Sequence, residues 1–182
     1  MLVFYKICYN LKGDKMSIKK EILDVYDNNG NITGKTVIRG EYDELSDNEH
    51  IPVVTIFIEN ENGEFLVQKT SKEKGGYFSF TGGHVDTLEK PFDAVKREVK
   101  EELGISIDDE NIEDLGFIIF NRPIRFLYYL KKNININELI LQKEEVEYVK
   151  FMKIEEIDKL IETKDLLKSH GILFNKIIKK ID

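Results

Sequence analysis

Three glutamates, Glu98, Glu101 and Glu102, stand close enough together to act on one ligand. Residues three or four apart on an α-helix share a face, so these side chains converge within one turn if the segment is helical. Carboxylates held this close repel one another and raise one another's pKa. A hard divalent cation with a preference for oxygen ligands cancels that repulsion, and Mg²⁺ is the obvious candidate. The spacing therefore predicts a magnesium site on a helix.

The segment that carries these glutamates has the pattern of an amphipathic helix from Pro91 to Leu103. Pro91 suits the first turn, where its missing N–H is no loss. Gly104 stands in the usual place for a left-handed C-terminal cap. Apolar residues recur at spacings of three or four and mark the side expected to be buried: Phe92, Val95, Val99 and Leu103.

A wider pattern surrounds the glutamates. Gly83 is followed after five residues by Glu89, and after seven more by Arg97-Glu98. A solvated acidic helix face is the ordinary explanation for clustered glutamates. That explanation does not account for a glycine before the helix, a glycine after it and an arginine beside the acids. The segment Gly83–Ile105 resembles the Nudix box, G-x5-E-x7-R-E-U-x-E-E-x-G-U with U aliphatic, at every specified position.

The resemblance implies roles for individual residues. Glu98, Glu101 and Glu102 would be metal ligands, with the carbonyl of Gly82 as a further ligand. Arg97 would orient Glu89. The metal would be Mg²⁺, with Mn²⁺ able to replace it.

The implied reaction is hydrolysis of a diphosphate linkage. Mg²⁺ can bridge phosphate oxygens, lower the pKa of a bound water and stabilise charge that develops during transfer. A carboxylate must accept the proton of the water. Glu89, Glu101 and a glutamate outside the box are candidates, and the last is chosen as Glu145 in the run Gln142–Glu147, with Glu144 and Glu147 as alternatives. A surface role for these last acids is equally compatible with the sequence.

The elements around the box indicate a mixed sheet covered by helices, an α/β (α+β) architecture. The resemblance makes this a Nudix-type α/β/α sandwich with an extra N-terminal β-hairpin. The expected strands are 21–27, 34–39, 51–59, 64–69, 77–81, 115–120, 125–131 and 145–152, and the further helices are 154–162 and 164–179.

The segment before the box, which includes LDVYDNNGNITGKTVIRG and His50, resembles Nudix proteins related to isopentenyl-diphosphate isomerase. The isomerase itself needs a cysteine just before the box, and Tyr77–Thr81 contains none. A non-catalytic nucleotide sensor is the second alternative, but such proteins usually carry a damaged box or a DNA-binding module. The sequence therefore favours a Mg²⁺-dependent pyrophosphohydrolase acting on a nucleoside diphosphate linked to another group.

Contacts with the rest of the substrate are less sharply indicated. Cationic side chains can bind phosphates or carboxylates, and aromatic rings can stack on a base. Solvated surface positions for the cations and a core position for the ring remain open. The candidates are Lys69, Arg122, Arg125 and Phe80.

Composition excludes several classes of protein. The net charge of −7 argues against a general nucleic-acid binder. No apolar run approaches the roughly 18 residues that a membrane-spanning helix needs. The single cysteine, Cys8, suits a reducing cytoplasm. We expect a cytoplasmic enzyme with a small-molecule diphosphate substrate, no nucleic-acid or membrane partner, and a homodimer as one assembly to test.

The first fifteen residues precede a second methionine, Met16, where the domain-like sequence begins. Lys12–Met16 can be encoded by a purine-rich, ribosome-binding sequence ahead of a start codon. We therefore expect residues 1–15 to be an over-extended start or a disordered terminus, and residues 16–182 to form one domain.

Overall fold

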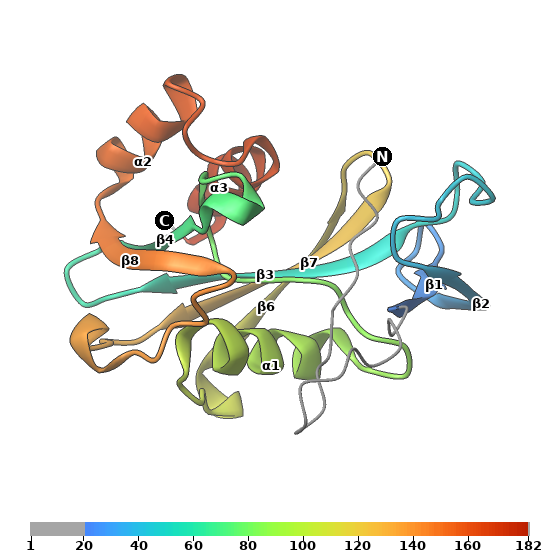
Figure 1. The fold of residues 1–182 in the computed structure, drawn as a ribbon, viewed down its shortest axis with the longest axis horizontal. Helices are drawn as coiled ribbons and strands as arrows, with labels where there is room; N and C mark the ends of the chain where they lie inside the picture. Colours follow the sequence, from blue (N-terminus) through green and yellow to red (C-terminus); the bar gives the residue numbers. More distant parts are fainter. Residues whose placement is uncertain (1–20, 182) are drawn as a thin grey trace.

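The computed structural model describes residues 21–181 (Figure 1), so the prediction for residues 1–15 lies outside the described residues. The strands are β1 (Ile22–Tyr26), β2 (Ile32–Ile38), β3 (Ile51–Glu59), β4 (Phe65–Thr70), β5 (Phe78–Ser79), β6 (Ile112–Ile119), β7 (Pro123–Lys131) and β8 (Val146–Met152). The helices are α1 (Pro91–Leu103), α2 (Ile154–Glu162) and α3 (Lys168–Ile181), and three short 3₁₀ turns cover Lys72–Lys74, Asp109–Asn111 and Ile136–Glu138.

The central sheet is mixed. Its strand order is β5-β4-β3-β7-β6, and β8 pairs with the other side of β4 from Phe65 to Thr70. β3 and β7 run parallel and pair along their whole length, whereas the other pairs are antiparallel. β3 meets β4 only near Glu59 and Phe65. The segment after β5 fills the space beside the first half of β3, where Thr81 and Gly83 accept hydrogen bonds from its main chain.

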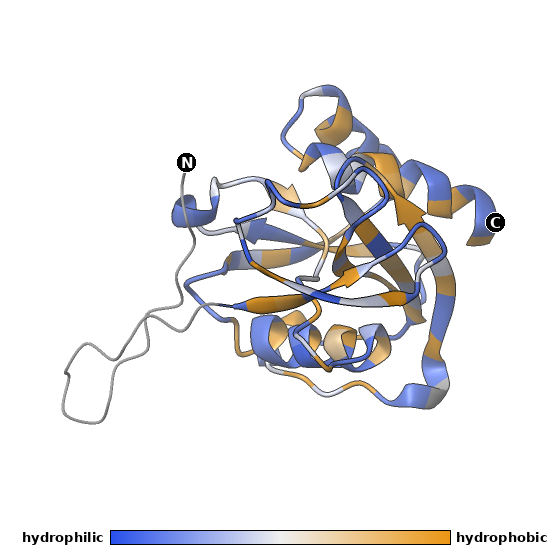
Figure 2. Ribbon diagram, turned by 90° about the vertical axis from the view of Figure 1, so that its right-hand side faces the viewer, coloured by the Kyte–Doolittle hydropathy of each residue, from blue (hydrophilic) through white to orange (hydrophobic). Residues whose placement is uncertain are grey.

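Helices cover both faces of this sheet, which confirms the predicted α/β/α sandwich. α1 lies on one face, and α2 and α3 lie on the other (Figure 1). The α1 side is packed around Val54, Ile56 and Val99. The opposite side is packed around Phe57 and Phe174. The hydropathy colouring shows apolar and polar residues interleaved along the strands and helices (Figure 2).

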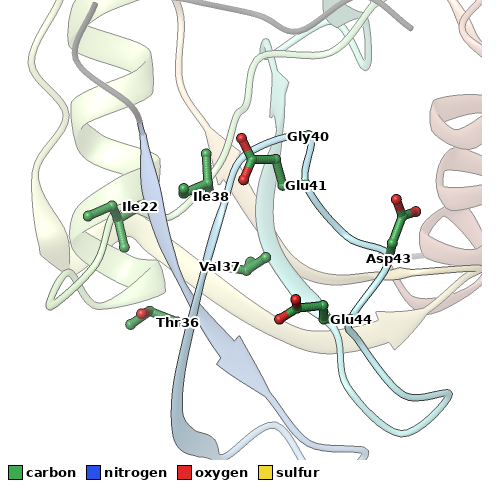
Figure 3. Close-up of a pocket in the computed structure, with 8 residues that line it drawn as sticks. All are labelled: Ile22, Thr36, Val37, Ile38, Gly40, Glu41, Asp43 and Glu44. Atoms are coloured by element: carbon green, nitrogen blue, oxygen red, sulfur yellow. The ribbon is translucent and has the colours of Figure 1, made fainter.

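The predicted N-terminal hairpin is present as the two-stranded sheet β1–β2, beside one end of the central sheet (Figure 1). Its turn is tied to the main body by His50, whose Nε2 lies 2.7 Å from Oδ1 of Asn28 and whose Nδ1 lies 3.1 Å from the carbonyl of Arg122. A hollow of about 590 Å³ borders β2 and the loop after it (Figure 3). Its lining includes Ile22, Val37 and Glu44 but none of the clustered glutamates of α1.

Several predicted boundaries were wrong: β5 is shorter than predicted, β7 begins at Pro123 rather than at Arg125, and three further elements begin elsewhere. The last helix begins at Lys168 rather than at Lys164, because Lys164 has a left-handed backbone and Leu166 bridges to Phe78. β6 begins at Ile112 and contains a bulge between Asp114 and Phe117. β2 begins at Ile32, two residues earlier than expected.

No helix within the described part of the chain is long and apolar enough to span a membrane.

Candidate active site

The helix α1 presents the acidic residues from a fixed base. It covers Pro91–Leu103 as predicted, with proline at its start. Gly104 closes it in the left-handed conformation at φ 76°, and its N–H bonds to the carbonyl of Lys100. Val95, Val99 and Leu103 are fully buried against the sheet. These contacts fix the rotation of the helix, so the glutamates between the apolar positions are directed toward the loop at Gly82 and Gly83.

Arg97 is the centre of the acidic cluster. Its Nε and Nη2 donate to the two carboxylate oxygens of Glu89, both at 2.9 Å. Its Nη1 donates to Glu98 at 2.8 Å and to Glu101 at 3.3 Å, and Nη2 also reaches the carbonyl of His84 at 2.9 Å. Burial opposes the charge of Arg97, but the hydrogen bonds and charges of Glu89 and Glu98 raise its pKa above the ordinary value. One guanidinium thus holds three of the carboxylates and the loop before the helix.

Glu102 is the most deeply placed of the glutamates, at 7% exposure. Its Oε2 accepts a hydrogen bond of 3.1 Å from Nε2 of Gln68 on β4. The amide of Gln68 is held in turn by Thr81, whose hydroxyl donates to Oε1 of Gln68 at 3.0 Å. Burial raises the pKa of Glu102 to about 8, and the charge of Glu98 adds to the rise. Ionisation of Glu102 is therefore costly unless positive charge is brought to it.

Glu98 lies against the glycine loop. Burial raises the pKa of Glu98 to about 7, against the opposing influence of Arg97. A Cβ on Gly83 would stand 2.3 Å from a carboxylate oxygen of Glu98, so a side chain there would displace the carboxylate. A Cβ on Gly82 would stand 2.1 Å from the carbonyl of Val54, which admits no side chain at all. The two glycines let the main chain pass between β3 and the acids.

The residues on either side of Gly82 are held to β3 by their carbonyls. Thr81 and Gly83 accept hydrogen bonds from Ile56 and Val54 of β3 at 3.0 and 2.8 Å. Carbonyls alternate in direction along an extended chain. We therefore expect the carbonyl of Gly82, which lies between them, to point away from β3.

The donor set suits a hard divalent cation. Glu98 and Glu102 are carboxylates whose charge is disfavoured by burial, and Glu101 joins them on the same turn of α1. Oxygen ligands and concentrated negative charge are what Mg²⁺ binds. As the side chains stand within residues 21–181, no three acids or histidines converge on one point. Nη1 of Arg97 forms ion pairs with both Glu98 and Glu101. A bound cation would replace part of this pairing in neutralising the two carboxylates.

Of the predicted residues outside the box, Glu145 influences the acidic cluster, whereas Lys69 faces the other side of the sheet. Glu145 precedes β8, its Oε1 is 2.7 Å from Nζ of Lys74, and its charge is felt by Glu102. Nζ of Lys69 lies over the ring of Phe78, 4.3 Å from the centroid. Lys69 follows Gln68 on β4, so its side chain projects from the opposite face of the sheet.

The other residues predicted to contact the substrate differ in whether their side chains are already occupied by contacts within the protein. Arg125 is part-buried on β7, burial lowers its pKa, and its Nη1 donates to the carbonyl of Phe120 at 3.0 Å. Nη1 of Arg122 donates to the carbonyls of Leu45, Ser46 and Glu49, so this group fastens the loop before β3. Phe80 is 1% exposed and packs against Phe57, His170 and Phe174. Burial leaves Phe80 no face for a substrate ring, so we assign it to the core.

Gln68, Thr81 and Asp24 were not anticipated from the sequence. Asp24 on β1 is 7% exposed and accepts hydrogen bonds of 2.8 Å from the hydroxyl of Thr87 and the N–H of Leu88. A weak signal did exist for Gln68, which interrupts the buried run FLVQ of β4 with an amide. A buried polar side chain needs a partner, but the sequence does not say which.

The contacts of Gln68 lead to a prediction. A Gln68→Met variant keeps the volume of the side chain but removes the side-chain donor to Glu102. We expect the affinity for Mn²⁺, measured by electron paramagnetic resonance, to fall about 10-fold, the lower end of the cost of losing a partner behind a metal ligand. Thr81→Val should change the affinity in the same direction and by less, because it frees the amide to rotate. Unchanged Mn²⁺ affinity in both variants would contradict a role for Gln68 at the site.

Comparison with known proteins gives a consistent result. Residues 49–170 match the family model described as the NUDIX domain. An uncharacterised Nudix hydrolase of Listeria monocytogenes is 35% identical over 141 residues, which is 75% of this chain and 82% of the relative. The crystal structure of DR0079 from Deinococcus radiodurans superposes with a TM-score of 0.71 at 18% identity, covering 86% of this chain and 98% of that one. An Ap4A hydrolase of C. elegans superposes with a TM-score of 0.53 at 21% identity, covering 71% and 97%.

Proposed function

Because the chain belongs to the NUDIX family, it is a hydrolase that acts on pyrophosphate bonds of small molecules, and we propose that it uses Mg²⁺ to cleave a nucleoside diphosphate linked to another group. The family generally uses divalent cations. The choice of Mg²⁺, with Mn²⁺ as a substitute, and the nucleoside part of the substrate are proposals that rest on the residues of this chain.

The acidic cluster carries the proposal. Glu98, Glu101 and Glu102 are presented by one helix turn, and two of them are buried at a cost that only positive charge relieves. A purely structural cluster would gain nothing from burying carboxylates without cationic partners for each of them. We assign Glu98, Glu101, Glu102 and the carbonyl of Gly82 as ligands. Mg²⁺ bound there would neutralise phosphate charge and make a bound water more acidic.

Other residues of the chain would orient the proposed ligands and accept the proton of the water. Arg97, fixed by Glu89, orients Glu98 and Glu101 through Nη1. Gln68 holds Glu102 from the sheet side. The oxygen of the water forms a bond to one phosphorus, the bridging P–O bond breaks, and a carboxylate accepts the proton of the water.

The contacts rank the candidate bases. Both oxygens of Glu89 accept from Arg97, and one also accepts from the N–H of Asp86 at 3.1 Å. Glu145 is paired with Lys74 at 2.7 Å. Glu101 is more exposed than Glu89 and has only the longer 3.3 Å contact with Arg97. We therefore propose Glu101 as the group that accepts the proton, with Glu89 as its support through Arg97.

The part of the substrate beyond the diphosphate would contact cationic side chains. We keep Arg125 for this role, because it presents a cation from a strand of the central sheet. Lys69 is a weaker candidate, because its side chain projects from the face of the sheet opposite to Gln68. Arg122 is also a weaker candidate, since its Nη1 is bonded to main-chain carbonyls. The hairpin β1–β2 agrees with the resemblance to the isomerase-related subgroup, which stays a prediction because the comparisons identify the family and not the subgroup.

The experiment that tests the function is hydrolysis of a panel of diphosphates with Mg²⁺. The panel contains nucleoside triphosphates, nucleotide sugars, dinucleoside polyphosphates and non-nucleoside diphosphates, each assayed with wild type and with Glu102→Gln. We expect turnover by wild type alone, highest on a nucleoside diphosphate linked to another group. Highest turnover on a non-nucleoside diphosphate would contradict the nucleoside part of the proposal. No turnover by a folded, Mg²⁺-binding wild type would contradict the proposed substrate class as a whole.

A further inference from the structure

The hairpin β1–β2 contacts the loop that leads into the acidic helix, although it lies outside the residues 49–170 that match the family model. The contact is made by Asp24. Its Oδ1 accepts from the hydroxyl of Thr87 and its Oδ2 from the N–H of Leu88, both at 2.8 Å. The carbonyl of Ile22 also accepts from the N–H of Thr87 at 3.2 Å. The hairpin therefore holds the two residues that come directly before Glu89.

The held loop has a conformation that it would not favour alone. Leu88 has φ 65°, in the left-handed region, and is 92% exposed. A non-glycine residue in this region is strained, because its Cβ comes too close to the main chain. An exposed leucine gains no burial that could offset the cost. The hydrogen bond that the carboxylate of Asp24 accepts from the N–H of Leu88 is the visible compensation, since hydrogen bonds to charged groups are the stronger ones.

The loop passes this restraint on to the acidic cluster. The N–H of Glu89 bonds to the carbonyl of Asp86, and the N–H of Asp86 bonds to Oε2 of Glu89, at 3.1 Å each. The turn thus fixes the carboxylate of Glu89, which engages Arg97 through two hydrogen bonds. Arg97 in turn reaches Glu98 and Glu101. Hydrogen bonds, together with the main chain of residues 86–89, therefore join Asp24 to the carboxylates of α1.

We propose that Asp24 is a positioning residue for hydrolysis, which holds the loop 86–89 and through it the Glu89–Arg97 pair in working geometry. The assignment rests on the proposed function of the acidic cluster. It gives the N-terminal hairpin a task in catalysis, although none of its side chains need touch the substrate.

The test combines hydrogen exchange with kinetics in the full chain. Asp24→Asn keeps the size of the side chain but removes the charge and one of the two acceptors. In the metal-free protein we expect amide exchange in residues 86–89 to become about 10-fold faster. With the best substrate of the diphosphate panel, we expect kcat to fall about 10-fold while KM stays within about twofold. Thr87→Val, which leaves the hairpin intact, should change both quantities in the same direction by less.

Asp27→Asn is the matched control. It makes the same chemical change on the same hairpin, but Asp27 accepts from the N–H groups of Asn29 and Asn31 within the turn. We expect it to leave kcat and exchange in 86–89 at wild-type values. Unchanged exchange or unchanged kcat in Asp24→Asn would overturn the proposal, and so would an equal effect of Asp27→Asn. The exchange result needs no substrate or metal, so it stands apart from a failure of the proposed function.

Discussion

The Glu102→Gln variant is expected to lose about 10³-fold in kcat and to melt no lower than the wild type. Removal of a single group that stabilises developing charge costs roughly 10²–10³-fold in other hydrolases, and a ligand of the metal should lie at the upper end of that range. Stability should not suffer, because burial raises the pKa of Glu102 to about 8 and makes its charge unfavourable in the folded chain. Glutamine keeps the shape, and its carbonyl can still accept from Gln68.

Steady-state kinetics and thermal unfolding of the metal-free protein at pH 8 check this prediction. Glu113→Gln, an exposed change on β6 with the same loss of charge, is the control and should match wild type in both measurements. A kcat within about threefold of wild type would remove Glu102 from the proposed ligands. A large fall in melting temperature would mean that the carboxylate stabilises the fold instead.

Mg²⁺ is expected to raise the melting temperature, and to raise it more at pH 8.5 than at pH 6. Glu98 and Glu102 have folded-state pKa values raised to about 7 and about 8. The metal-free folded chain therefore binds protons between about pH 4.5 and 8 that the unfolded chain has released, and its stability falls as the pH rises through this range. A cation binds the ionised carboxylates, so at high pH its binding restores the stability that the metal-free chain loses when they ionise.

The size of the effect follows from mass action. A ligand at 100 times its Kd stabilises the folded state by about 2.7 kcal/mol, and each kcal/mol corresponds to roughly 2–4 °C for a chain of this length. We expect a rise of about 5–10 °C at pH 8.5 with saturating Mg²⁺. Differential scanning fluorimetry at both pH values, with Mg²⁺ or EDTA, measures it. An equal rise at pH 6 and pH 8.5, or none at either, would contradict a cation held by these carboxylates.

The comparison at constant pH is needed because other groups titrate in the same experiment. Burial lowers the pKa of His84 and His170 to about 4 each. The unfolded chain binds protons at these histidines between about pH 4 and 6.5 that the folded chain does not, so their contribution to stability grows as the pH rises through that range. The contribution of the histidines is the same with Mg²⁺ and with EDTA, so it cancels in the difference between the two melting temperatures at one pH.

The acidic helix could be predicted from the sequence because its signals are local. Pro91, the apolar spacing and Gly104 lie within one segment, and the observed bounds are the predicted ones. β3 and α2 were likewise predicted to the residue, from a run of β-branched residues and from helical spacing. The start of α3 was not, because the left-handed backbone of Lys164 and the bridge from Leu166 to Phe78 depend on a strand about ninety residues earlier.

In the site, too, contacts implied by a local pattern could be predicted, and contacts between separate elements could not. The pairing of Glu89 with Arg97 was implied by the resemblance, and the structure shows it as two hydrogen bonds. The extension of Arg97 to Glu101 and the contacts of Gln68 and Asp24 could not be inferred, since each joins residues from separate elements. Phe80 looked available because aromatic residues serve both cores and binding sites, and only its position above Phe57 decided between them.

The parallel pair β3–β7 also has a consequence for how the protein is made. Ile51 pairs with Pro123 and Glu59 with Lys131, so the two strands are 72 residues apart in the chain. At a synthesis rate of about 5–20 residues per second, β7 is completed roughly 4–14 s after β3. During that time a strongly β-forming, apolar segment, IPVVTIFIE, has an unpaired edge. Expression yield should therefore depend on growth temperature and chaperone supply more than the stability of the finished fold would suggest.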